Sequence, residues 1–271
     1  MKKIGIALAG GGARGAYQIG ALKAMKESGF LDFGEIHAIS GASIGSINAC
    51  FLAMDAIEEA ERLWLNLEET DLLQNDGKLF QRLAEERFDF IRRGMYRTDH
   101  FENWLDEIID FDAVRKHNVY VTTSHVGGSD CNFFELMTLN IRELFGRETL
   151  IRYPSLKDMD DEHIRKTILA SCAIPVFFKP VVIDDETYYD GGVLDNTPYK
   201  PLIDAGCEEI IVIDLFRINF SRKREEDGVP IRQFFPKRHL RGILNFDKRQ
   251  IKRRFDLGYG ETLERIENED Y

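Results

Sequence analysis

The chain has 271 residues, of which 44% are hydrophobic and 31% charged, and its formal net charge is -11. This composition excludes a disordered tail protein, a collagen and a small disulfide scaffold, and a chain of this length can bury a core without disulfides or metals. Nucleic-acid binders are more often basic, because phosphate neutralisation drives their affinity. We therefore expect no nucleic-acid partner.

The cysteines and the N-terminal sequence both favour a reducing compartment. Four widely spaced cysteines form no CxxC pair, namely Cys50, Cys131, Cys172 and Cys207. We expect these cysteines to be buried free thiols. The apolar stretch after Lys3 is too short for a signal peptide, and no apolar run approaches the roughly 18 residues that span a bilayer. We expect a cytoplasmic protein.

Two strand–turn–helix units are predicted within the first 54 residues. The short apolar run 4–9 predicts a buried strand, and helical spacing of apolar residues follows over 16–28. A second short strand, 36–39, leads through a glycine-containing turn to a second helix at about 47–54. This repetition is typical of a mostly parallel sheet with helices on its faces.

The middle of the chain is less regular. Residues 57–110 look helical and amphipathic, 119–123 is a β-branched strand, and 133–139 is its predicted partner. A helix near 160–172 precedes a hairpin of 181–183 with 187–189, and 210–215 is a last buried strand.

Positive charge is concentrated near the C-terminus. Residues 217–254 hold thirteen Lys or Arg against four Asp or Glu, so the remainder is strongly acidic. The segment suits an anionic membrane surface, although a solvated loop and helix that balance the body's charge is the commoner explanation. The spacing of Phe246, Ile251, Phe255 and Leu263 predicts a mainly helical segment that packs on the domain.

The G-x-S-x-G pattern at 41–45 is the strongest chemical feature. Gly41 and Gly45 flank Ser43 between a predicted strand and a predicted helix. Such a turn strains the serine and exposes its hydroxyl near a helix N-terminus, where an oxyanion is favoured. An N-cap serine in a tight turn is the alternative without chemistry.

A second glycine-rich turn, 10–15, follows the first strand. It satisfies G-x-G-x-x-G, yet the second strand ends at Ser40 without the acidic residue that dinucleotide binding requires. Glycines at a helix start also present free N–H groups to a developing oxyanion. Together with Ser43, this turn favours an acyl-transfer site.

A serine nucleophile needs a base, and two candidates follow it. His239 is the only histidine after Asp190, and it lies in the basic segment. Asp190 ends a predicted strand and precedes Gly191 and Gly192, which allow close backbone approach. A dry site that raises the pKa of Asp190 would let it accept the Ser43 proton directly. A simple turn is the alternative for these three residues.

Three motifs in this order resemble the patatin-like phospholipases. They are the glycine-rich turn (Gly10, Gly11, Gly12, Ala13, Arg14, Gly15), the G-x-S-x-G around Ser43, and Asp190-Gly191-Gly192. Ser171 begins a segment similar to the family's S-x-A-x-P-x-x-F, and Asn196-Thr197-Pro198 matches its N-x-P. The resemblance covers most of the chain, to about Leu215, and it suggests a bacterial single-domain member.

The resemblance implies a three-layer αβα sandwich with a mostly parallel central sheet. It also implies a Ser43–Asp190 dyad as nucleophile and general base, without histidine, metal or cofactor. The oxyanion hole would comprise Gly11, Gly12 and Ala13, with Arg14 beside it. The substrate would be a phospholipid or another acyl ester, cleaved through an acyl-serine intermediate.

The expected organisation is one catalytic domain over 1–215, with 57–110 as a candidate helical cap and 216–271 packed on the same domain. The basic stretch 217–254 would make any peripheral contact with an anionic membrane. Two alternatives remain open: a lipid- or acyl-binding protein with a vestigial site, and a serine esterase or thioesterase that uses His239.

Overall fold

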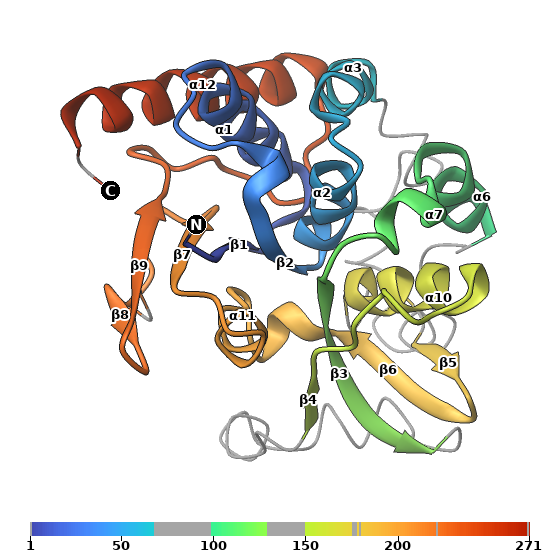
Figure 1. Ribbon diagram of the computed structural model, residues 1–271. Helices are drawn as coiled ribbons and strands as arrows, with labels where there is room; N and C mark the ends of the chain where they lie inside the picture. The colour runs from blue at the N-terminus through green and yellow to red at the C-terminus, as the bar shows by residue number, and fades with distance from the viewer. Residues whose placement is uncertain are drawn as a thin grey trace.

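A single sheet runs through the molecule, as the computed structural model in Figure 1 shows. The structure describes residues 2–67, 99–128, 150–174, 178, 180–220, 222–269 and 271. The strand order is β5-β6-β3-β2-β1-β7-β9-β8, with β4 paired to β3. The strands are β1 (Ile4–Leu8), β2 (Ile36–Ala42), β3 (Val119–Gly128), β4 (Ile151–Arg152), β5 (Val181–Ile183), β6 (Glu186–Asp190), β7 (Glu209–Ile213), β8 (Glu225–Glu226) and β9 (Val229–Phe234).

The central part of the sheet is parallel. β3, β2, β1, β7 and β9 pair in parallel in that order, whereas β6, β5, β4 and β8 pair antiparallel at the two sides. The carboxyl ends of parallel strands meet at one edge of a sheet, so the turns after β1, β2 and β7 lie together.

Helices cover both faces of the sheet. They are α1 (Ala16–Glu27), α2 (Ile44–Ala53), α3 (Ile57–Asn66), α6 (Asp99–Ile108), α7 (Phe111–Val114), α10 (Asp161–Cys172), α11 (Lys200–Asp204) and α12 (Lys248–Asn268), with short 3-10 turns η1 (Gly12–Gly15), η2 (Phe33–Glu35) and η4 (Gly191–Val193). In Figure 1, α1, α2, α3 and α12 lie on one side of the central strands and α11 on the other. The predicted three-layer fold with a mostly parallel sheet is therefore confirmed.

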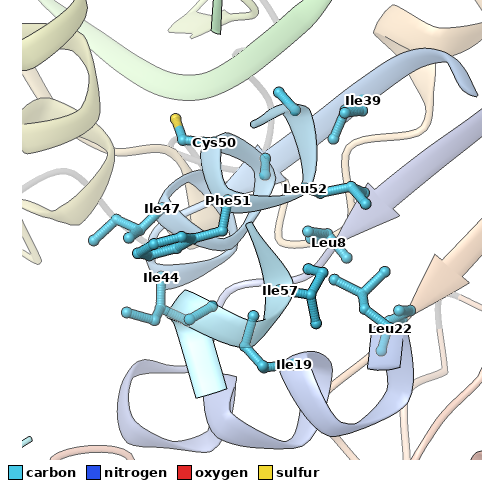
Figure 2. Packing of buried hydrophobic residues seen from close by; sticks show 14 of the residues in the cluster. Leu8, Ile19, Leu22, Ile39, Ile44, Ile47, Cys50, Phe51, Leu52 and Ile57 are labelled. Atoms are coloured by element: carbon cyan, nitrogen blue, oxygen red, sulfur yellow. The ribbon is translucent and has the colours of Figure 1, made fainter. Parts of the chain in front are cut away.

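Successive residues of β1 face two different cores. Ile6 and Leu8 belong to the larger core, and Ala7 belongs to a smaller cluster with Leu202 of α11. This alternation is the period of a strand that is covered on both faces. In Figure 2, side chains from α1, α2 and α3 lie in one cluster with Leu8, and this packing holds α2 against the sheet.

Two glycines allow α1 and α12 to pack at very short range. A Cβ on Gly20 would lie 2.1 Å from the carbonyl oxygen of Phe255, and one on Gly258 would lie 2.0 Å from that of Tyr17. Because real Cβ atoms do not approach backbone oxygens so closely, both positions require glycine at this packing distance.

Several element boundaries differ from those expected. β2 continues to Ala42 and α2 begins at Ile44, so Ser43 alone connects them. The hairpin of β5 and β6 is confirmed. The segment after residue 215 also contributes β8 and β9 besides α12, and these strands were not predicted. The strand expected at 133–139 lies outside the described residues.

Candidate active site

Ser43 occupies a strained turn at the carboxyl end of β2. Its φ of 52° and ψ of -127° lie outside the regions that side chains favour. A Cβ on Gly41 would lie 2.3 Å from the carbonyl oxygen of Gly45, and one on Gly45 would lie 2.2 Å from that of Leu8. The two glycines of the pattern are thus needed so that the turn can close. The serine itself is only 7% exposed.

Asp190 is the last residue of β6 and lies opposite Thr123 of β3. Its carboxyl group accepts a 2.7 Å hydrogen bond from the backbone N–H of Gly192 and lies beside the Ser43 hydroxyl. Burial raises the pKa of Asp190 from 3.8 to about 7, although the Ser43 hydroxyl and the Gly192 N–H both act in the opposite direction. The structure therefore brings together the two residues that the sequence nominated.

The turn after β1 lies against Ser43. A Cβ on Gly10 would lie 3.1 Å from the Cβ of Ser43. Gly10 and Asn196 exchange hydrogen bonds: the N–H of Gly10 donates to the Asn196 carbonyl and the Asn196 amide donates to the Gly10 carbonyl, each at 3.1 Å. Asn196 thereby fixes the glycine-rich turn beside the serine.

The four expected oxyanion residues are not equivalent. The N–H of Ala13 donates to the carbonyl of Ile243 at 2.7 Å, and that of Arg14 donates to the carbonyl of Gly11 at 3.2 Å. Within the described part of the chain, the N–H groups of Gly11 and Gly12 have no such acceptor. Gly12 has a φ of 54°. The available donors are those of Gly11 and Gly12, whereas Ala13 and Arg14 use their N–H groups structurally.

Ser171 holds the backbone of Ser43 in place. Its Oγ accepts a 2.9 Å hydrogen bond from the N–H of Ser43, and the side chain is fully buried near the end of α10. The sequence marked this residue only as part of a family-like segment, without a role.

Arg254 of α12 was missed by the sequence analysis. It is 2% exposed, and its guanidinium group donates to four backbone carbonyls: Ala13 (3.1 Å), Leu240 (3.0 Å), Gly242 (3.0 Å) and Asn245 (2.6 Å). Burial lowers its pKa to about 10. It ties the loop 240–245 to the glycine-rich turn. Its neighbours Lys252 and Arg253 are exposed. The sequence of three basic residues therefore did not indicate that the third one, Arg254, is buried.

An apolar pocket of about 60 Å³ adjoins Ser43. Its wall combines α6, the end of α10 and the segment after residue 215, through Phe101, Cys172, Ile174, Phe178, Leu244 and Phe246. The helix α6 is part of the proposed cap over 57–110. Residues 68–98 of that stretch lie outside the described residues, so the cap remains a prediction.

Histidine takes no part in the described contacts of this site. His239 is exposed between β9 and α12. Among the described histidine side chains, none hydrogen-bonds to Ser43 or Asp190. The geometry favours the carboxylate as the partner of the serine.

Comparison with known proteins identifies the family. The sequence matches the patatin-like phospholipase family over residues 6–203. The chain belongs to this family. Membership of this family supports hydrolysis of lipid esters. The matched region ends at residue 203, before the loop 240–245 and Arg254.

Relatives of this patatin-like chain are distant and mostly longer. Lysophospholipase NTE1 of Cryptococcus neoformans var. neoformans is 26% identical over 231 residues, which cover 83% of this chain and 12% of the relative. YqhO of Bacillus subtilis is 25% identical over 206 residues, which cover 70% of this chain and 63% of the relative. The chain thus spans only a small part of NTE1 and less than two thirds of YqhO.

The fold also occurs in a solved structure. VipD from Legionella pneumophila superposes with a TM-score of 0.56 at 15% identity, over 98% of this chain and 67% of VipD. At this identity the likeness concerns the patatin-like fold alone. In the part of the chain that the structure describes, no helix is both long and apolar enough to cross a membrane.

Proposed function

We propose that the protein is a serine hydrolase that cleaves acyl esters of phospholipids or related lipids with a Ser43–Asp190 dyad. The observation that carries the proposal is the strained Ser43 beside a buried carboxyl group, that of Asp190, whose pKa is raised by burial to about 7. A base with this pKa is about half ionised at neutral pH, so that a substantial fraction of the protein can accept a proton. The lining of the adjoining pocket is apolar, as contact with the part of the acyl chain next to the ester requires.

In the first step, Asp190 accepts the hydroxyl proton while Ser43 Oγ attacks the ester carbonyl carbon. The carbonyl oxygen becomes an oxyanion, which the N–H groups of Gly11 and Gly12 stabilise, a contribution of about 3–4 kcal/mol per donor in comparable sites. Collapse of the tetrahedral intermediate releases the alcohol, which takes the proton from Asp190. The acyl group stays on Ser43.

In the second step, Asp190 takes a proton from a water molecule that attacks the acyl-serine. The new tetrahedral intermediate expels Ser43 Oγ, which recovers its proton from Asp190, and the fatty acid leaves. Ser171 acts on neither step directly. It keeps the strained turn oriented through the N–H of Ser43.

A fluorophosphonate probe, which forms a covalent bond with activated serines, tests the proposal. We expect wild-type labelling at a rate that rises with pH through about 7, as Asp190 ionises. Ser43→Ala should abolish labelling, and Asp190→Asn should slow it by at least about 100-fold. His239→Ala is the control and should label like wild type.

Two outcomes would refute the dyad: rapid labelling of the Asp190→Asn protein, or loss of labelling in the His239→Ala protein. A folded wild-type protein that never labels, yet binds fatty acid, would favour the acyl-binding alternative.

A further inference from the structure

Exposed apolar side chains gather on one part of the surface. In the described part of the chain, seven large apolar side chains are exposed, and five of them lie in three loops. We call these five the apolar rim: Val193, Phe216, Ile218, Phe220 and Ile243. Phe220 is 99% exposed and Ile218 57% exposed. Exposed apolar side chains that gather on one surface of a protein often mark an interaction site.

Contacts join the three loops into one surface. The guanidinium group of Arg14 lies 4.8 Å from the ring centre of Phe216, and its Nε donates to the carbonyl of Arg241 at 2.8 Å. Arg14 therefore bridges the loop after β7 and the loop before α12. Val193 and Asn219 line the same 240 Å³ cavity, which places the third loop beside the loop after β7.

The apolar rim borders the entrance to the active site. A Cβ on Gly12 would lie 2.2 Å from the carbonyl oxygen of Ile243, so this loop touches the glycine-rich turn directly. The next residue, Leu244, lines the apolar pocket beside Ser43. A surface that covers the rim would thus lie at the mouth of that pocket.

The charges at the rim are mainly positive. Within 192–194, 214–220 and 240–249, the exposed charged residues are Arg217, Arg241, Lys248 and Arg249, against one carboxylate, Asp247. The other carboxylate of these segments, Asp214, is fully buried and bonded to Asn219 and Arg222. The surface therefore combines apolar side chains with guanidinium groups, which is the chemistry that binds an anionic lipid interface.

We propose that the apolar rim docks the protein on an anionic phospholipid bilayer. Ile218 and Phe220 enter the boundary between headgroups and acyl chains, and Arg217 and Arg241 face the lipid phosphates. The inference rests on the proposed function, since it names the surface from which the lipid enters the Ser43 pocket. Charge complementarity selects this partner over a second copy of the chain, whose rim would carry the same positive charges.

Binding to vesicles tests the inference. The Ser43→Ala protein is used, so that hydrolysis does not change the lipid, with vesicles of phosphatidylcholine alone or with roughly one third phosphatidylglycerol. We expect co-sedimentation with the anionic vesicles that weakens as salt is raised. Adding Ile218→Ser and Phe220→Ser should weaken binding by about tenfold or more, because apolar burial is lost.

Val182→Ser is the matched control. Val182 is an exposed valine on β5, separated from β7 by β6, β3, β2 and β1, and its replacement should leave binding unchanged. Equal binding by the rim variant, or no preference for anionic vesicles, would overturn the inference. So would self-association in light scattering that the rim substitutions abolish. Soluble-ester turnover by wild type tests the proposed function separately, since failure there leaves the vesicle measurement valid.

Discussion

At the scale of single residues, Asp190 sits where its neutral form is favoured. Its carboxyl group is 4% exposed, and burial raises its pKa from 3.8 to about 7. Between these pH values the folded state holds a proton that the unfolded state has lost. Stability therefore falls as the pH rises from about 4 to 7, by about 4 kcal/mol in total from this group.

An asparagine at this position cannot titrate and keeps an oxygen for the N–H of Gly192. We expect the Asp190→Asn protein to be more stable than wild type at pH 8, by up to about 4 kcal/mol, and the difference to disappear near pH 4. Urea unfolding at both pH values measures this. Asp204→Asn, at an exposed position, is the control. A stability difference that does not change with pH would contradict the expectation.

Ser43 and Asp190 could be predicted from the sequence because the glycines that each of them needs are its close neighbours in the chain. The flanking glycines lie within two residues of them in the sequence, and Gly41, Gly45 and Gly191 are sterically necessary because a Cβ there would meet backbone atoms. The role of Ser171 could not be predicted in the same way, since its hydrogen bond reaches a residue 128 positions away. The sequence also could not predict that the N–H of Ala13 is already hydrogen-bonded, because its acceptor, the carbonyl of Ile243, lies 230 residues away.

At the scale of elements, the close packing of α1 and α12 depends on Gly258. A Cβ there would meet the Tyr17 carbonyl oxygen at 2.0 Å, whereas a Cβ on Gly260 meets nothing within 4 Å. Gly258→Ala should therefore destabilise the fold by about 1–3 kcal/mol through overpacking. Gly260→Ala in the same helix should stabilise it by about 0.5–1 kcal/mol through helix propensity.

Thermal unfolding distinguishes the two variants, since 1 kcal/mol corresponds to roughly 2–4 °C for large domains. The two melting temperatures should move in opposite directions. If both melting temperatures rise, α1 and α12 can move apart at little cost, and the short distance between them does not require glycine at 258.

Elements with a strong local pattern were predicted well. The first strands and helices and the β5–β6 hairpin have clear apolar periodicity or turn signals. β9 did not, because its residues 229–234 include a proline and an arginine and its strand character comes from pairing with β7. Pairing between distant segments leaves little trace in the sequence of either one.

At the scale of the whole molecule, the segment after the family match is structurally integral. β9 extends the sheet beside β7, α12 packs on α1, and Arg254 holds the glycine-rich turn. Buried side chains of this segment include Phe234, Phe246, Ile251 and Phe255.

A chain that ends at Leu215 would expose the apolar faces of β7 and α1 and lose Arg254. We expect it to lack a cooperative unfolding transition and to be degraded rapidly in limited proteolysis, with the full chain as the control. A truncated protein that is soluble, unfolds cooperatively and labels with the serine probe would show that the segment is dispensable.

The sheet ends beyond β9 in a strand of two residues, Glu225 and Glu226. A strand of two charged residues offers few free hydrogen-bonding groups to another chain, and its charged side chains resist burial in a second sheet, which are two ways in which proteins avoid joining sheets edge to edge. β8 therefore disfavours pairing of this sheet edge with another chain. Replacing both glutamates with valine would leave an uncharged, β-prone edge, on which strands of other chains could pair and assemble into fibres.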